Sequence, residues 1–207
     1  MLLFWAASVL ASPVREVHPA PAHPLMVTEE DEGSWPVVYE GRTAWFDGYA
    51  DPRTGTAHRM FGALDLGFEV RDEEQAIDVA WTLLEDNEWL LQVPLFELRL
   101  ARVELLHGQW VVLFERWHGG YRVEGAQVDV RIRRDRVQMV GLDTFPFGFE
   151  PPWEGPPTDE ERVWVPLDRG GELIGVLADR VEVQEHGVWE LLYLQGEELV
   201  AREQLLR

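Results

Sequence analysis

The sequence predicts an α+β fold in which one helix lies across an antiparallel β-meander. Residues 109–143 are expected to form three consecutive strands, because β-branched and aromatic residues are frequent there and polar turns separate the runs. Residues 72–89 carry the strongest helical pattern of apolar residues in the chain. These two observations together predict a helix packed on a sheet, followed by further strands near the C-terminus.

A glycine pair sets the register of the meander. Residues 110–118 precede Gly119 and Gly120 as one strand, and residues 137–142 return later as the third strand. The strand between them has apolar residues at every second position: Ala126, Val128, Val130 and Ile132. At least one of the two glycines should have a positive φ angle, because a tight hairpin between twisted strands requires it.

The helix is expected to begin at a capping box. The Asp72 side chain can accept a hydrogen bond from the backbone of the first turn, and the Gln75 side chain can reach back. An apolar stripe then follows at helical spacing: Ala76, Ile77, Ala80, Trp81, Leu83 and Leu84. The helix is therefore amphipathic and should bury one face on the sheet.

The remaining strands are placed by alternation and by turn residues. Residues 96–105 alternate and should pair with residues 110–118 across a turn at His107 to Gln109. Prolines concentrated in residues 146–157 mark the boundary between two halves of the chain. The other expected strands are 35–39 and 42–46 before the helix, and 172–177, 179–184 and 188–194 after the proline-rich segment.

The run from Phe114 to Ala126 resembles the hallmark segment of the fungalysin/thermolysin propeptide (FTP) domain. Four residues match that hallmark: Phe114, Gly120, Val123 and Gly125. Three differ, since Arg116, His118 and Arg122 stand where the family usually has glutamine, an aromatic residue and proline. From Thr158 onward the chain is more weakly similar to the PepSY-type half of such propeptides.

The resemblance implies a cystatin/PepSY-like architecture of two similar small subdomains. Residues 35–145 would be the FTP-like domain, residues 146–157 a proline-rich linker and residues 158–207 a partial PepSY-like domain. Gly119, Gly120 and Gly125 would be structural turn residues.

The N-terminus predicts export. Residues 1–11 are uncharged and apolar, and they end in Val9, Leu10 and Ala11, which is typical of a signal peptide cleavage site. Residues 12–34 are expected to be a linker rich in proline and acidic residues. A buried first strand or helix is the alternative interpretation of residues 1–11. We expect a secreted or periplasmic protein, and the absence of cysteine excludes disulfides and thiolate chemistry.

The charge of the chain restricts its partners. The formal net charge is -20, which repels phosphate backbones and anionic lipid, so we expect neither nucleic-acid nor membrane binding. Residues 96–143 are the exception, with 7 acidic residues and 8 arginines. A protein partner is best accommodated in this balanced region.

No residue pattern predicts catalysis. The six histidines are scattered, and the zinc motif H-E-x-x-H, the G-x-S-x-G elbow and the phosphate and dinucleotide fingerprints are all missing from the sequence. Chance pairs of carboxylates are inevitable among 38 acidic residues, so a glycosidase-like pair carries no specificity. We therefore assign no catalytic, metal-binding or cofactor-binding residue.

The strand before the glycine pair carries the candidate partner contacts. Strict alternation places Trp110, Phe114 and His118 on one face and Trp117 on the other. Because tryptophan and arginine are favoured at interfaces, Arg116, Trp117 and His118 are the predicted partner-binding residues. Alternatively, the exposed ring simply covers a neighbouring helix.

The resemblance implies a function without catalysis. In the FTP family the propeptide helps a secreted zinc metalloprotease to fold and holds it inactive. The expected partner is thus a zinc metalloprotease catalytic domain, in cis or in trans. The alternatives are a stand-alone exported binding module or protease inhibitor of the same fold, and a small hydrolase using acidic residues in a strand cleft.

Overall fold

The computed structural model describes residues 32–51, 55–144, 146–155, 160–170, 172–185 and 188–205. The predicted signal peptide, residues 1–11, and most of the predicted linker lie outside the described residues. The last three residues of that linker, 32–34, belong to the first strand.

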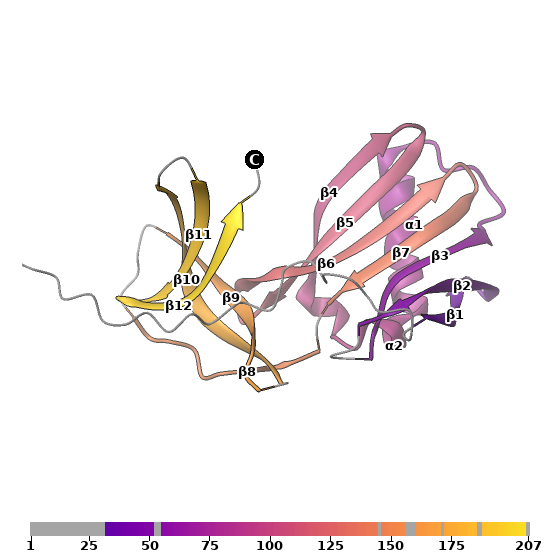
Figure 1. Ribbon diagram of the computed structural model, residues 1–207. Helices are drawn as coiled ribbons and strands as arrows, with labels where there is room; N and C mark the ends of the chain where they lie inside the picture. The colour runs from indigo at the N-terminus through magenta and orange to yellow at the C-terminus, as the bar shows by residue number, and fades with distance from the viewer. Residues whose placement is uncertain are drawn as a thin grey trace, which may run out of the picture.

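The described chain is built mainly from strands (Figure 1). The first half contains β1 (Glu32–Tyr39), β2 (Arg42–Ala50), β3 (Ala57–Asp65), α1 (Glu73–Asp86), α2 (Glu88–Leu91), the 3-10 helix η2 (Leu95–Glu97), β4 (Leu98–Leu106), β5 (Gln109–His118), β6 (Tyr121–Arg133) and β7 (Arg136–Asp143). The second half contains β8 (Gly148–Phe149), β9 (Glu161–Asp168), β10 (Leu173–Glu185), β11 (Val188–Gln195) and β12 (Glu198–Leu205).

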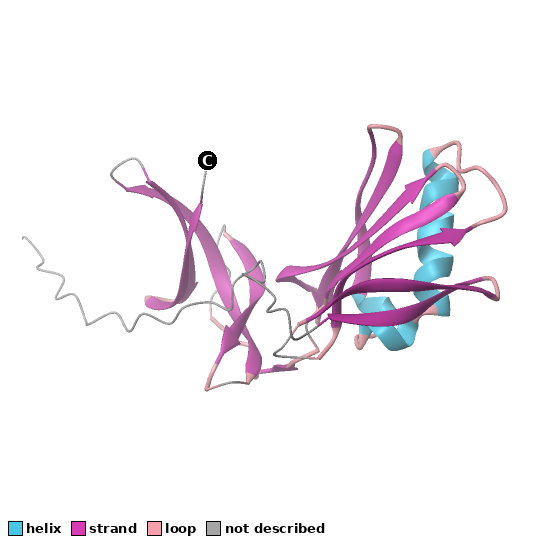
Figure 2. Cartoon of the chain, turned by 45° about the vertical axis from the view of Figure 1, so that its right-hand side comes forward, coloured by secondary structure: helices cyan, strands magenta, loops and turns pink. Residues whose placement is uncertain are grey.

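The predicted α+β class with two similar small subdomains is wrong. Strands make up 64% of the described residues and helices 13%, and twelve strands form one mixed sheet. The main path through the sheet runs β1-β2-β3-β7-β6-β9-β10-β11-β12, with β5 and β4 branching from β6 and β8 pairing with β10. Both helices lie in the first half, so the described part of the second half does not repeat the first (Figure 2).

Two-residue turns close the β1–β2, β4–β5, β5–β6 and β6–β7 hairpins. His118 pairs with Tyr121, which leaves Gly119 and Gly120 as the loop, and their φ angles are 57° and 91°. Positive φ at both central positions is the type I′ requirement, so the predicted hairpin and its positive φ are confirmed. The expected pairing of residues 96–105 with 110–118 is also confirmed, as β4 with β5.

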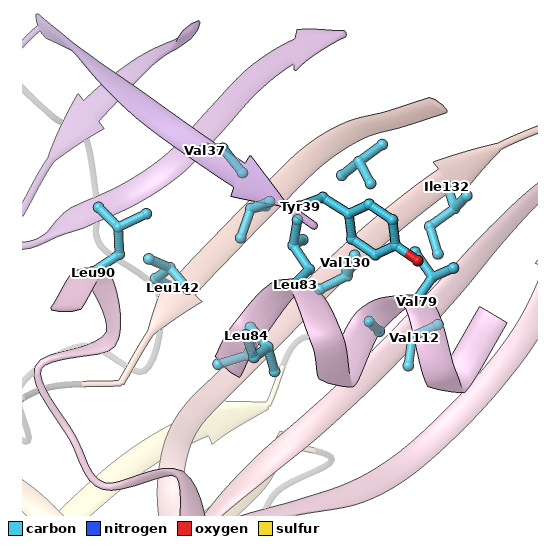
Figure 3. Close-up of a cluster of buried hydrophobic side chains, with 14 of the residues drawn as sticks. Val37, Tyr39, Val79, Leu83, Leu84, Leu90, Val112, Val130, Ile132 and Leu142 are labelled. Atoms are coloured by element: carbon cyan, nitrogen blue, oxygen red, sulfur yellow. The ribbon is translucent and has the colours of Figure 1, made fainter. Parts of the chain in front are cut away.

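The helix begins where the sequence indicated. The backbone N–H of Gln75 donates to Asp72 Oδ1 at 2.9 Å, and the backbone N–H of Arg71 donates to Gln75 Oε1 at 3.0 Å. Asn87 ends α1 and ties it to β1, because its side chain bonds both the N–H and the carbonyl of Val38. The buried face of α1 packs on β1, β4 and β5 (Figure 3). The core there includes Val79, Leu83, Leu84, Val112, Val130 and Ile132.

The long strand β6 joins the two halves. Glu115 of β5 pairs with Gln127, but Trp117 pairs with Arg122, so the register shifts between these pairs. Gly125 lies inside this irregular stretch with φ 68°. The beginning of β6 then pairs in parallel with β9, over only two residue pairs: Arg122 with Val163 and Val123 with Trp164.

The second half is an antiparallel meander of β9, β10, β11 and β12. Its core contains Val163, Val165, Leu167, Val176, Ala178, Leu191 and Tyr193. The expected strands 172–177 and 179–184 are one continuous strand, β10. Its glycine, Gly175, lets the Phe149 ring pack directly on the backbone, since an added Cβ would lie 2.5 Å from that ring.

Candidate functional site

Arg116, the first predicted partner-binding residue, is buried. Its side chain is 4% exposed, and its Nε donates to Glu97 Oε2 at 2.7 Å. A second nitrogen, Nη1, donates to the backbone carbonyl of Thr144 at 3.0 Å. The guanidinium also lies 5.3 Å from the ring centre of Phe147 and 5.1 Å from that of Phe149. Burial lowers the pKa of Arg116, although the hydrogen bond and charge of Glu97 oppose this change.

His118 occupies the boundary between the halves. Its Nδ1 lies 2.7 Å from Glu97 Oε1, and its ring stacks on Phe149 with 3.7 Å between ring centres. The indole N–H of Trp164 donates to the His118 backbone carbonyl at 2.9 Å. The His118 side chain keeps 37% of its surface exposed.

Trp117 has a different environment. It is partly exposed, and the Arg99 guanidinium lies over its ring at 4.2 Å from the centre. The expectation that Arg116 would reach a partner is wrong, because this side chain points into the protein. Trp117 and His118 keep surface that a partner could contact.

A charged cluster lies beside this boundary. Arg122 contacts Glu161 and Glu124 at 3.0 Å each, and Arg180 lies 3.6 Å from Glu124 and 3.7 Å from Glu161. The hydrogen bond from Arg122 lowers the pKa of Glu161, although burial opposes it. The stabilisation from Glu161 is thus complete above its unfolded pKa and is lost as pH falls through the lowered pKa.

The edge strand β4 is a surface that sequence reasoning did not single out. Among the described strands, β4 pairs only with β5, so its other edge is open. Large apolar side chains are exposed on and beside it: Phe96 at 85%, Leu105 at 56%, Leu106 at 48% and Leu100 at 40%. The one signal in the sequence was the Leu105–Leu106 pair, which must place an apolar side chain on each face of the strand.

The described residues contain no group of three or more histidine, aspartate or glutamate side chains arranged to hold a metal ion. No helix within the described ranges has the length and apolarity needed to cross a bilayer.

Comparison with known proteins gives little information. No protein-family model and no curated protein matches the chain. Among solved structures, the chain is similar to the C-terminal domain of YpeB from Bacillus megaterium. The two share 11% identity with a TM-score of 0.39, over 86% of this chain and 92% of that one. A likeness at this level supports no functional conclusion.

Proposed function

We propose that this protein is a non-catalytic, propeptide-like domain that binds the catalytic domain of a secreted zinc metalloprotease, in cis or in trans. It would assist folding of the protease and inhibit it. The sequence resemblance in Phe114 to Ala126 supports the choice of partner. The observation that carries the binding role is the open edge of β4 with its exposed apolar side chains.

An edge strand of this kind is suited to protein binding. Its unpaired N–H and carbonyl groups can accept a further strand, while side chains on alternate positions enter pockets of the partner. Charges often protect such edges, and β4 carries Arg99, Arg102 and Glu104; Leu100 and Leu105 are nevertheless apolar and at least 40% exposed. Coverage by a partner would remove this apolar surface from water.

The neighbouring charges also favour docking there. Residues 96–143 are nearly balanced in charge, whereas the remainder of the chain is strongly acidic. An acidic protease surface would therefore be repelled least at β4 and β5. Trp117 with Arg99 over its ring lies on the same pair of strands and extends the apolar contact.

The test uses the catalytic domain of a thermolysin-type zinc metalloprotease. The purified chain should inhibit that domain at micromolar concentration and raise its recovery from denaturant. The double substitution Leu100→Lys and Leu105→Lys should weaken inhibition at least tenfold. Trp45→Lys is the matched control, since Trp45 is 65% exposed on β2, away from β4.

Two results would contradict the proposal. One is an absence of inhibition and of assisted refolding by a chain whose fold is verified by circular dichroism. The other is equal inhibition by the wild type and the double variant, which would remove β4 from the contact.

A further inference from the structure

The face of the sheet opposite α1 carries a groove of about 580 Å³. Its walls include four arginines, Arg59, Arg102, Arg131 and Arg133, and one acidic residue, Asp129. Asp129 and Arg131 alternate along β6 with the core residues Val128 and Val130, so they point away from α1. We call this surface the arginine groove.

Strand register shows that the groove runs across the strands. Arg59 pairs with Gly141, Gly141 with Asp129, Asp129 with Leu113, and Leu113 with Arg102. This row crosses four inter-strand gaps, about 19 Å, which is the length of about six residues of extended chain. An arginine stands at each end.

The groove is positive on a negative protein. Its four arginines and one aspartate give a net charge of +3 with His107 neutral, against -20 for the whole chain. Arg131 is neutralised by Asp129 at 2.9 Å, and Arg102 lies 3.4 Å from Glu104. The guanidinium groups of Arg59 and Arg133 have no hydrogen bond or ion pair with the described part of the chain. Two arginines are therefore ready to bind an external anion.

We infer that the arginine groove binds an extended, acidic segment of a partner polypeptide. Guanidinium groups hold carboxylates through paired hydrogen bonds. Arg59 and Arg133 are separated by two inter-strand gaps and four residues along β6, about 16 Å, which matches acidic residues about five positions apart in an extended segment. Leu113 and Val111 line the floor beside them and fit the apolar side chains of a peptide. Nucleic acid is disfavoured, because the -20 charge of the chain repels a long polyanion.

This inference goes beyond the proposed function and does not depend on a protease partner. The test selects dodecapeptides from a random phage-displayed library on the full-length chain. Selected peptides should contain at least two acidic residues four to seven positions apart. Their binding, measured by fluorescence anisotropy of labelled peptides, should weaken at least tenfold in the double variant Arg59→Gln/Arg133→Gln.

The matched control is Arg71→Gln. The Arg71 side chain is 76% exposed and lies outside the groove, so this variant should bind the peptides like the wild type. Circular dichroism of each variant verifies the fold. Selected peptides without acidic residues, or binding unchanged by Arg59→Gln/Arg133→Gln, would overturn the inference. So would an oligothymidine that binds through the same arginines more tightly than any selected peptide.

Discussion

Replacing Arg116 with methionine should destabilise the protein strongly. The substitution keeps a long apolar side chain near Phe147 and Phe149, but it leaves the buried Glu97 carboxylate without its cation. Removing one partner of a buried ion pair costs 3–5 kcal/mol in general. The lower figure, about 3 kcal/mol, applies here because His118 still contacts Glu97. For a chain of this size, that corresponds to a fall in Tm of about 6–12 °C.

The assay is urea unfolding followed by tryptophan fluorescence, combined with a double-mutant cycle. Glu97→Met alone should also destabilise, whereas the double variant Arg116→Met/Glu97→Met should lose at least 2 kcal/mol less than the sum of the single losses, roughly the coupling of a contacting pair. Arg71→Met, at an exposed arginine 3.8 Å from Glu69, should change stability by less than about 0.5 kcal/mol. A loss below about 1 kcal/mol for Arg116→Met, or additive losses in the cycle, would refute this reasoning.

Three further substitutions test the packing. Gly48→Ala places a Cβ 2.0 Å from the Arg59 carbonyl oxygen, so unfolding free energy should fall by about 3 kcal/mol, and an unchanged urea midpoint would contradict this close approach. Gly125→Ala, at φ 68°, should cost about 1–2 kcal/mol in the same assay, and a neutral result would show that the bend of β6 relaxes. Burial, with help from nearby carboxylates such as Glu203, raises the pKa of Tyr193. The stabilisation from this shift is thus complete below pH 10, the pKa of the unfolded tyrosine, and is lost at higher pH because the unfolded tyrosine ionises first. Tyr193→Phe should make the loss of unfolding free energy above pH 10 shallower. An identical slope for the variant would contradict this.

Local sequence signals predicted the β5–β6 hairpin and the start of α1, but they did not predict β3. The glycine pair Gly119–Gly120 admits positive φ angles, and such angles select the two-residue turn that fixes the β5–β6 register. The first residue of the helix could also be predicted, because a capping box is a contact between residues three positions apart in the sequence. Signals of this kind lie within a few residues of the structure that they specify.

The join between the halves could not be predicted in this way. It depends on two residue pairs, Arg122 with Val163 and Val123 with Trp164, that are about forty positions apart in the chain. Proline-rich residues 146–157 indicated a boundary, but the same strand, β6, belongs to the sheet on both sides. The alternation of apolar residues did not predict that β6 pairs with β9, because the sequence pattern of a buried strand does not depend on which strand it pairs with.

The position of Arg116 was missed for a related reason. Alternation along β5 in fact places Arg116 on the face of Phe114, and the structure buries Val112, Phe114 and Arg116 at every second position. Arginine is usually found at the surface, and the burial of Arg116 depends on its ion pair with Glu97. Glu97 comes from a separate 3-10 turn, so no local pattern connected the two residues.

Arg116, His118 and Arg122 share a structural role at the junction between the two halves. Each contacts a residue of the second half: Arg116 and His118 lie against Phe149, and Arg122 binds Glu161. Parallel pairing of β6 with β9 covers only two residue pairs, so these side-chain contacts and the apolar cluster of Val123, Ala126, Trp164, Leu173 and Leu177 also hold the halves together. Arg116, His118 and Arg122 therefore stabilise the junction between the halves within this chain.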